Sequence, residues 1–130
     1  MTGDGKRSPM ALIAEDDEKL SVIVTEAMRQ AGFDARVYHD GADALKTIQV
    51  LRPAVVVLDL HLPQVSGEEI LKTIRQTPEL AQMRVIITTA DATLAAALRQ
   101  PGDLVFIKPI SFLQLRDVAK QLRAAITPAD

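Results

Sequence analysis

Short apolar runs alternate along the chain with longer segments in which apolar residues recur every three or four positions. The runs are typical of strands, and we expect these at residues 10–14, 33–38, 54–58, 85–89 and 104–107. Most are short, apolar and bounded by turn-forming residues, which is typical of strands buried on both faces of a sheet. The second run instead alternates with period two, which favours a strand at the edge of the sheet.

The segments between these runs have the spacing of amphipathic helices. We expect helices to begin at Glu18, at Asp40-Gly41 and at Gly67, a weaker one at 91–100, and a last one whose apolar face ends at Ile126. Breaking residues follow the first four helices, and they are Gly32, Pro53, Thr77-Pro78 and Pro101-Gly102. Glycine and proline at these places are helix stop signals.

Strand and helix therefore alternate five times. That order predicts an α/β fold in which a doubly wound, five-stranded parallel sheet is covered by helices on both faces, with right-handed crossovers. No repeat or low-complexity linker divides the pattern, so we expect one domain at residues 10–126 between short tails at 1–9 and 127–130.

Composition narrows the possible partners. The chain has 130 residues, of which 48% are hydrophobic and only 3% aromatic, so Val, Ile, Leu and Ala must fill the core. Fifteen Lys and Arg face 17 Asp and Glu without a basic stripe, which argues against direct contact with nucleic acid. The chain lacks cysteine, a run long enough to cross a membrane and a signal-like start. We therefore expect a cytoplasmic protein that has no membrane contact.

Four of the predicted strands end in polar residues, namely Glu15-Asp16-Asp17, Asp59, Thr88-Thr89 and Lys108. All strands of a parallel sheet end at the same edge, where open α/β sheets bind their ligands. Taken singly, each residue has a simpler explanation: an acidic helix cap, a neutral threonine or an exposed loop lysine. Together they predict one pocket that contains carboxylates, a hydroxyl and an ammonium group.

The chemistry of this pocket points to phosphoryl transfer. Clustered carboxylates repel one another and need a cation, and oxygen ligands without His or Cys suit Mg²⁺. A free aspartate can attack phosphorus and form an acyl phosphate. Magnesium and Lys108 would neutralise the oxygens of the transferred group, and a threonine hydroxyl would hydrogen-bond the product.

The ordered motifs resemble the receiver domain of bacterial two-component response regulators over residues 10–126. The matching segments are Leu12-Ile13-Ala14-Glu15-Asp16-Asp17, Val57-Leu58-Asp59-Leu60-His61-Leu62-Pro63, Ser66-Gly67, Ile87-Thr88-Thr89-Ala90 and Ile107-Lys108-Pro109. This resemblance implies a flavodoxin-like (βα)5 sheet with strand order 2-1-3-4-5, an order for which the family itself is a known example. It also implies a cis peptide at Lys108-Pro109.

The resemblance assigns roles by position. Asp59 would be the phospho-acceptor, Thr89 the switch hydroxyl and Lys108 the phosphoryl-binding lysine. Asp16 would bind Mg²⁺ directly, Glu15 through water, Asp59 by its carboxylate and His61 by its backbone carbonyl. Asp17 falls one place beyond the acidic pair, so we expect it to cap the following helix.

The same resemblance implies a phosphorelay function. The phosphoryl donor would be a sensor histidine kinase or a phosphotransfer protein. The receiver would be no enzyme in the ordinary sense, although it assists its own phosphorylation and autodephosphorylation. Its effect would pass through a homodimer or a downstream effector protein.

Two departures from the family pattern keep a second function open. The family often has Tyr or Phe three residues before the lysine, where this chain has Val105, and period two directs the neighbouring Phe106 to the other face. The segment from Thr89 to Lys108 also looks short for the family. A receiver-like interaction module that works without phosphorylation is therefore an alternative. A phosphohydrolase is disfavoured, because such enzymes need a second acid where His61 stands.

Overall fold

A computed structural model describes residues 8–126. Residues 1–7 and 127–130, which belong to the two predicted tails, lie outside this range. The strands are β1 (Met10–Ala14), β2 (Asp34–Tyr38), β3 (Val55–Asp59), β4 (Arg84–Thr89) and β5 (Leu104–Ile107). The helices are α1 (Glu18–Gln30), α2 (Gly41–Leu51), α3 (Gly67–Gln76), α4 (Ala92–Leu98) and α5 (Phe112–Ala125).

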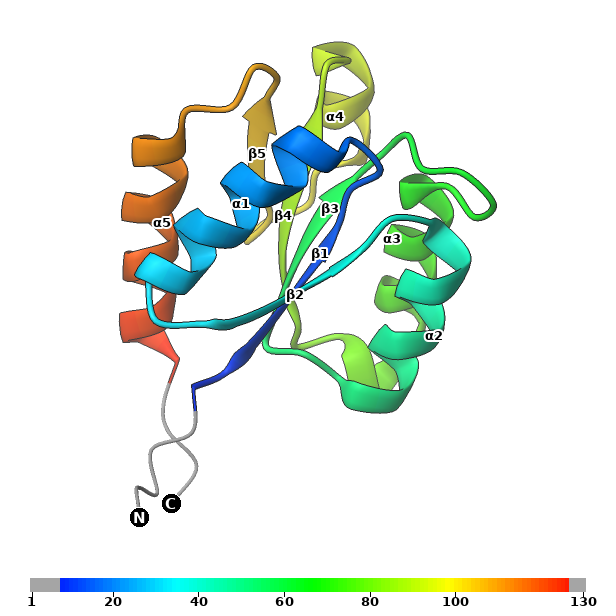
Figure 1. The fold of residues 1–130 in the computed structure, drawn as a ribbon. Coiled ribbons are helices and arrows are strands. Elements are labelled where there is room, and N and C mark those ends of the chain that lie inside the picture. Colours follow the sequence, from blue (N-terminus) through cyan, green and yellow to red (C-terminus); the bar gives the residue numbers. More distant parts are fainter. Residues whose placement is uncertain (1–7, 127–130) are drawn as a thin grey trace.

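The strands form one parallel sheet in the order β2-β1-β3-β4-β5 (Figure 1). The predicted fold class and strand order are confirmed, including the position of β2 at an edge. Strand β3 is central and buried along its whole length, as its run of β-branched residues predicts. Its last residue, Asp59, stands opposite Thr88 of β4.

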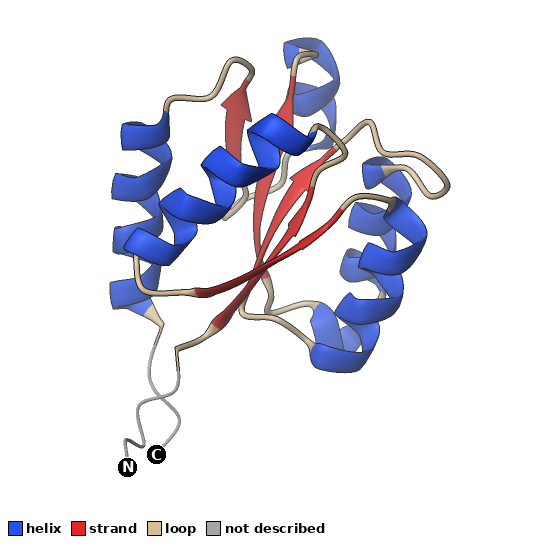
Figure 2. Ribbon diagram, viewed as in Figure 1, coloured by secondary structure: helices blue, strands red, loops and turns tan. Residues whose placement is uncertain are grey.

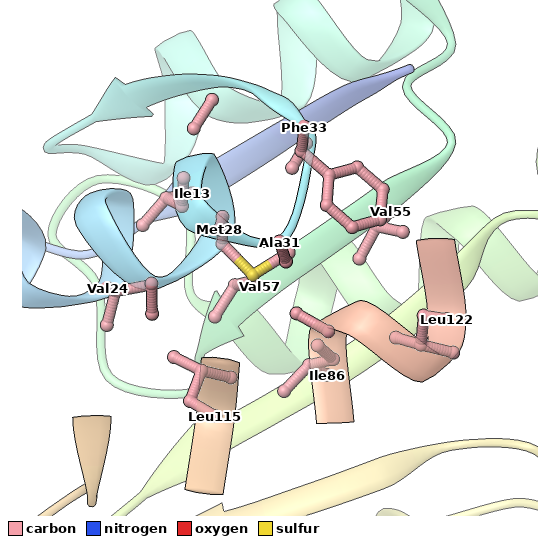
Figure 3. Close-up of a cluster of buried hydrophobic side chains, with 14 residues drawn as sticks. Ile13, Val24, Met28, Ala31, Phe33, Val55, Val57, Ile86, Leu115 and Leu122 are labelled. Atoms are coloured by element: carbon pink, nitrogen blue, oxygen red, sulfur yellow. The ribbon is translucent and has the colours of Figure 1, made fainter. Parts of the chain in front are cut away.

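Helices cover both faces of the sheet, with α1 and α5 on one and α2, α3 and α4 on the other (Figure 2). Alternate residues of each strand contribute to separate apolar clusters, so that Ile13 and Val57 pack beneath α1 and α5 (Figure 3). Leu12 and Leu58 pack on the opposite side. Aliphatic side chains dominate both clusters, as the low aromatic content requires.

Short polar side chains begin the helices. Asp17, Asp40, Ser66, Asp91 and Ser111 each accept a hydrogen bond from a backbone N–H of the first turn of the helix that follows. Such caps satisfy donors that have no partner inside a helix. The predicted capping role of Asp17 is thereby confirmed, since Oδ1 of Asp17 lies 3.0 Å from the nitrogen of Leu20.

The region around α4 differs in detail from the sequence pattern. Helix α4 has seven residues rather than the ten expected, and Ala95 is its one buried side chain. Its C-terminal end is fastened from outside, because Arg75 of α3 donates to the carbonyl of Leu98 at 2.7 Å and forms an ion pair with Asp103. A 3₁₀ turn at Pro78–Leu80, which the pattern did not predict, follows α3.

No helix within the described residues is long and apolar enough to cross a membrane.

The loop that leads from β3 to α3 passes so close to the helix that only glycine fits at its start. A Cβ placed on Gly67 would lie 2.0 Å from the carbonyl oxygen of Asp59 and 2.7 Å from the Cα of Leu60. Both atoms belong to the backbone, so neither can give way as a flexible side chain does. Gly67 therefore holds α3 directly against the strand end that carries Asp59.

We expect Gly67→Ala to destabilise the protein by about 3 kcal/mol or more, because overpacking against fixed backbone is among the costlier single changes. Urea unfolding measures the loss. Gly102→Ala is the matched control: Gly102 has φ +93°, and, apart from its chain neighbours, no residue comes within 4 Å of the place that an alanine Cβ would take. Only the left-handed backbone cost of about 1–2 kcal/mol therefore applies there. An equal loss in the two variants would contradict the close approach at Gly67.

Candidate functional site

The polar strand ends gather at one edge of the sheet. Glu15 and Asp16 follow β1, Asp59 ends β3, Thr89 ends β4 and Lys108 follows β5. Because β1, β3, β4 and β5 are parallel neighbours, residues far apart in the sequence meet there (Figure 1). The convergence that the sequence predicts is therefore present in the fold.

The Lys108 ammonium group lies between two buried carboxylates. Its Nζ is 3.1 Å from Oδ2 of Asp59 and 3.1 Å from Oε1 of Glu15. The carboxylate side chains are each 3% exposed, whereas the lysine side chain is 24% exposed. One positive charge thus partly neutralises two negative charges that are almost wholly removed from water.

Backbone amides hold the remaining oxygens of these two carboxylates. The N–H of Asp17 donates to Oε2 of Glu15 at 3.0 Å, and the N–H of His61 donates to Oδ1 of Asp59 at 3.0 Å. Both acidic side chains are therefore fixed by a lysine on one oxygen and an amide on the other. Asp59 is presented in a single orientation at the end of its strand.

The acidic residues fit a divalent cation. Glu15, Asp16 and Asp59 each offer a carboxylate oxygen, and these atoms all lie within 4.8 Å of one another. Asp16 is exposed, so the group opens to solvent on one side. Lys108 neutralises only part of the negative charge, and oxygen donors of this kind are those that Mg²⁺ prefers. These residues would hold the metal; the predicted part of the His61 carbonyl stays a prediction.

Thr89 lies at the same edge and is fully buried. Its Oγ1 accepts a hydrogen bond from the N–H of Asp91 at 3.0 Å, and its carbonyl accepts from the N–H of Lys108 at 2.9 Å. Thr89 thus connects Lys108, which follows β5, to Asp91, the cap of α4. The Lys108-Pro109 peptide is cis, as the resemblance implied.

The two residues before Ile107 point in opposite directions. Val105 packs against the cluster beneath α2, α3 and α4, whereas Phe106 packs against the cluster beneath α1 and α5. The expectation that Phe106 faces away from the side occupied by residue 105 is confirmed. Phe106 therefore does not replace the aromatic side chain that the family often has at position 105.

One contact at this edge had no signal in the sequence pattern. Nδ1 of His39, in the turn between β2 and α2, lies 3.1 Å from the carbonyl oxygen of Glu15. A lone histidine before Asp40-Gly41 gives no periodic or motif signal. Only the register of β2 beside β1 brings His39 to the acidic turn, residues 15–17.

Comparison with known proteins gives a consistent result. A family model described as the response regulator receiver domain matches residues 11–120. The DNA-binding response regulator MtrA of Mycobacterium tuberculosis is 28% identical over 119 residues, covering 92% of this chain and 51% of that protein. The transcriptional regulatory protein TrcR of the same species is 32% identical over 111 residues, covering 83% of this chain and 43% of that protein.

A solved structure is also similar. The signal receiver domain of a putative LuxO repressor protein from Vibrio parahaemolyticus has a TM-score of 0.79 and 29% identity, with 92% of each chain covered. The present chain spans about half the length of the mycobacterial relatives, at 51% and 43%.

Glu15 and Lys108 change their charge in different pH ranges. Burial, reinforced by the charge of Asp59, raises the pKa of Glu15 from 4.5 to about 7, although the Asp17 amide and Lys108 act in the other direction. Burial would lower the pKa of Lys108, but its bonds and charge interactions with Asp59 and Glu15 outweigh that effect, so the pKa lies above its ordinary value. The lysine therefore stays charged while Glu15 titrates near neutrality.

We expect the metal-free protein to lose stability between pH 5 and pH 8. The folded protein binds the Glu15 proton more tightly than the unfolded chain does, so this contribution is complete below about pH 4.5 and lost as pH rises through about 7. The contribution of Lys108, whose pKa is raised, is lost only in the alkaline range. Urea unfolding in the presence of a chelator measures the decline.

Glu15→Gln is the control for this pH effect, because the amide does not titrate. The variant should flatten the decline by an amount on the order of 1–3 kcal/mol. An identical pH dependence in the wild type and in Glu15→Gln would show that another group causes it.

Proposed function

Because this chain belongs to the response regulator receiver domain family, we propose that it accepts a phosphoryl group on Asp59 in a two-component phosphorelay and thereby switches its partner interactions. The observation that carries this proposal is the placement of Lys108, 3.1 Å from both Asp59 and Glu15 at the edge where the strands end. An acceptor carboxylate, a cation-binding acidic pair and a fixed positive charge are the parts that phosphoryl transfer to aspartate needs.

In the proposed reaction an oxygen of Asp59 attacks phosphorus. A new bond forms between that oxygen and phosphorus, while the bond from phosphorus to the donor's leaving group breaks. The His61 and Lys108 contacts orient the carboxylate before the attack. Lys108, which is also paired with Glu15, would then neutralise negative charge on the phosphoryl oxygens. A bound Mg²⁺ would supply further positive charge for those oxygens.

Thr89 is well placed to transmit the reaction. Its hydroxyl accepts a bond from Asp91, the residue that caps α4. If the Thr89 hydroxyl rotates to donate to a phosphoryl oxygen, its hydrogen bond with the Asp91 N–H is altered. The position of the first turn of α4 is then altered as well. We propose this path, from Thr89 to the cap of α4, as the output route in a chain that has Val105 in place of an aromatic side chain.

Exposed apolar side chains on α1 and α5 suit a protein phosphodonor. Val22 and Ile23 of α1 are 64% and 42% exposed, and Leu113 at the start of α5 is 57% exposed. Exposed apolar side chains contribute to interaction surfaces where they lie close together. We propose that a histidine kinase or phosphotransfer protein docks there and that a homodimer or effector protein receives the signal.

The missing aromatic side chain favours a second candidate function, a receiver-like module that binds its partner without phosphorylation. Val105 packs against aliphatic neighbours and has no ring that could swing inward. In this case partner affinity would be the same for the wild type and Asp59→Asn, with and without phosphodonor. Affinity that depends on the phosphodonor would exclude the module.

We expect the chain to gain the mass of one phosphoryl group when it is incubated with acetyl phosphate and Mg²⁺. Asp59→Asn should abolish the gain, because the amide cannot act as the nucleophile. Intact-protein mass spectrometry measures both results. Asp40→Asn, which retains a side-chain oxygen at the cap of α2 outside the pocket, is the matched control and should be phosphorylated like the wild type. An adduct on Asp59→Asn would contradict the assignment.

A second test compares the effects of two adjacent carboxylates, Asp16 and Asp17, on Mg²⁺ binding. We expect Asp16→Asn to weaken Mg²⁺ binding at least about tenfold, because it removes one negative charge from the three carboxylates that would hold the ion. Asp17→Asn removes the same charge one residue away but retains the capping oxygen that bonds Leu20, so its effect should be small. Titration calorimetry compares the two. An equal loss would mean that only net charge, and not the position of the carboxylate, controls binding.

A further inference from the structure

Of the three carboxylates that would hold the cation, Glu15, Asp16 and Asp59, only Asp16 is exposed, so packing does little to fix its side chain. Its direction must therefore come from the backbone on either side of its Cα. Two peptide planes meet there: the plane that contains the Glu15 carbonyl and the plane that contains the Asp17 amide. Both planes are held by specific hydrogen bonds.

The second plane is held from within the acidic turn. The N–H of Asp17 donates to Oε2 of Glu15 at 3.0 Å. The side chain of Glu15 thus fixes the backbone just after Asp16, while its other oxygen contacts Lys108. This plane is consequently part of the pocket already described.

The first plane is held from outside the pocket by His39. The carbonyl oxygen of Glu15 lies 3.1 Å from Nδ1 of His39. A carbonyl oxygen only accepts hydrogen bonds, so Nδ1 carries the hydrogen and donates it. The N–H of Glu15 is meanwhile bound to the carbonyl of Tyr38 at 3.1 Å, which extends the β1–β2 ladder to this turn.

We propose that His39 is a positioning residue for the metal site: by holding the Glu15 carbonyl, it fixes the peptide plane before Asp16 and aims the Asp16 carboxylate at the cation. This inference rests on the proposed Mg²⁺-dependent function. His39 touches neither the cation nor the phosphoryl group and acts only through the backbone between Glu15 and Asp16. The edge strand β2 thereby has a part in the chemistry at the centre of the sheet.

A purely structural role predicts a different outcome. If His39 only fastened the β2–α2 turn, its loss would lower stability and leave the affinity for Mg²⁺ unchanged. Asp40→Ala provides the matched comparison, because Asp40 is the next residue and caps α2 through the amide of Asp43 at 2.8 Å. Its removal lowers stability, as the loss of a helix cap does, without touching Glu15.

The direct test is calorimetric titration of the purified protein with Mg²⁺ alone. His39→Ala should weaken binding by about two- to tenfold, the range that one hydrogen bond supports. His39→Asn should restore the affinity, because Nδ2 of Asn occupies the same position relative to Cβ as Nδ1 of His. Asp40→Ala should bind like the wild type.

A metal-free readout makes the test independent of metal loading. In a chelator, His39→Ala should speed hydrogen exchange at the Asp17 amide, and His39→Asn should slow it again, since that amide reports the order of the turn. Unchanged Mg²⁺ affinity in His39→Ala, or an equal loss in Asp40→Ala, would overturn this inference alone. Absence of Mg²⁺ binding by the wild type would overturn both this inference and the proposed function.

Discussion

The contact on which the site depends is the ammonium group of Lys108 between the carboxylates of Asp59 and Glu15. Two buried negative charges at the end of a sheet would repel each other strongly, and neither could be removed from water without a partner. One lysine cannot neutralise both carboxylates and the exposed Asp16 as well. The remaining negative charge is what would favour a divalent cation at this edge.

The parallel sheet makes this contact possible. Five strands that run in one direction bring residues from β1, β3, β4 and β5 to one edge, and two aliphatic clusters hold the sheet between its helices. Gly67 keeps α3 against the end of β3, and the Asp91 cap ties α4 to Thr89. The scaffold thus fixes the groups of the proposed site, while the short α4, with one buried residue, has fewer buried residues than α1, α2, α3 or α5.

The sequence predicted the strand and helix order, the shared edge and the capping role of Asp17, because these follow from periodicity and from local hydrogen bonding. It predicted the opposite directions of Val105 and Phe106 for the same reason. The short segment from Thr89 to Lys108 indicated a reduced fourth helix, but not its end at Leu98 or the bond that Arg75 of α3 makes to the Leu98 carbonyl. Nor did the sequence identify His39, whose contact with Glu15 arises only when β2 pairs with β1. Contacts between elements leave no periodic trace in a single sequence.

The proposed cation site is best tested by a crystal structure of the chain with Mn²⁺ in place of Mg²⁺, analysed by anomalous diffraction. We expect one strong anomalous peak at about 2.0–2.3 Å from carboxylate oxygens of Asp16 and Asp59, with Lys108 beside it. A peak elsewhere, or an edge at which Lys108 excludes the ion at saturating Mn²⁺, would contradict the claim that these distant residues form one cation-dependent acceptor site.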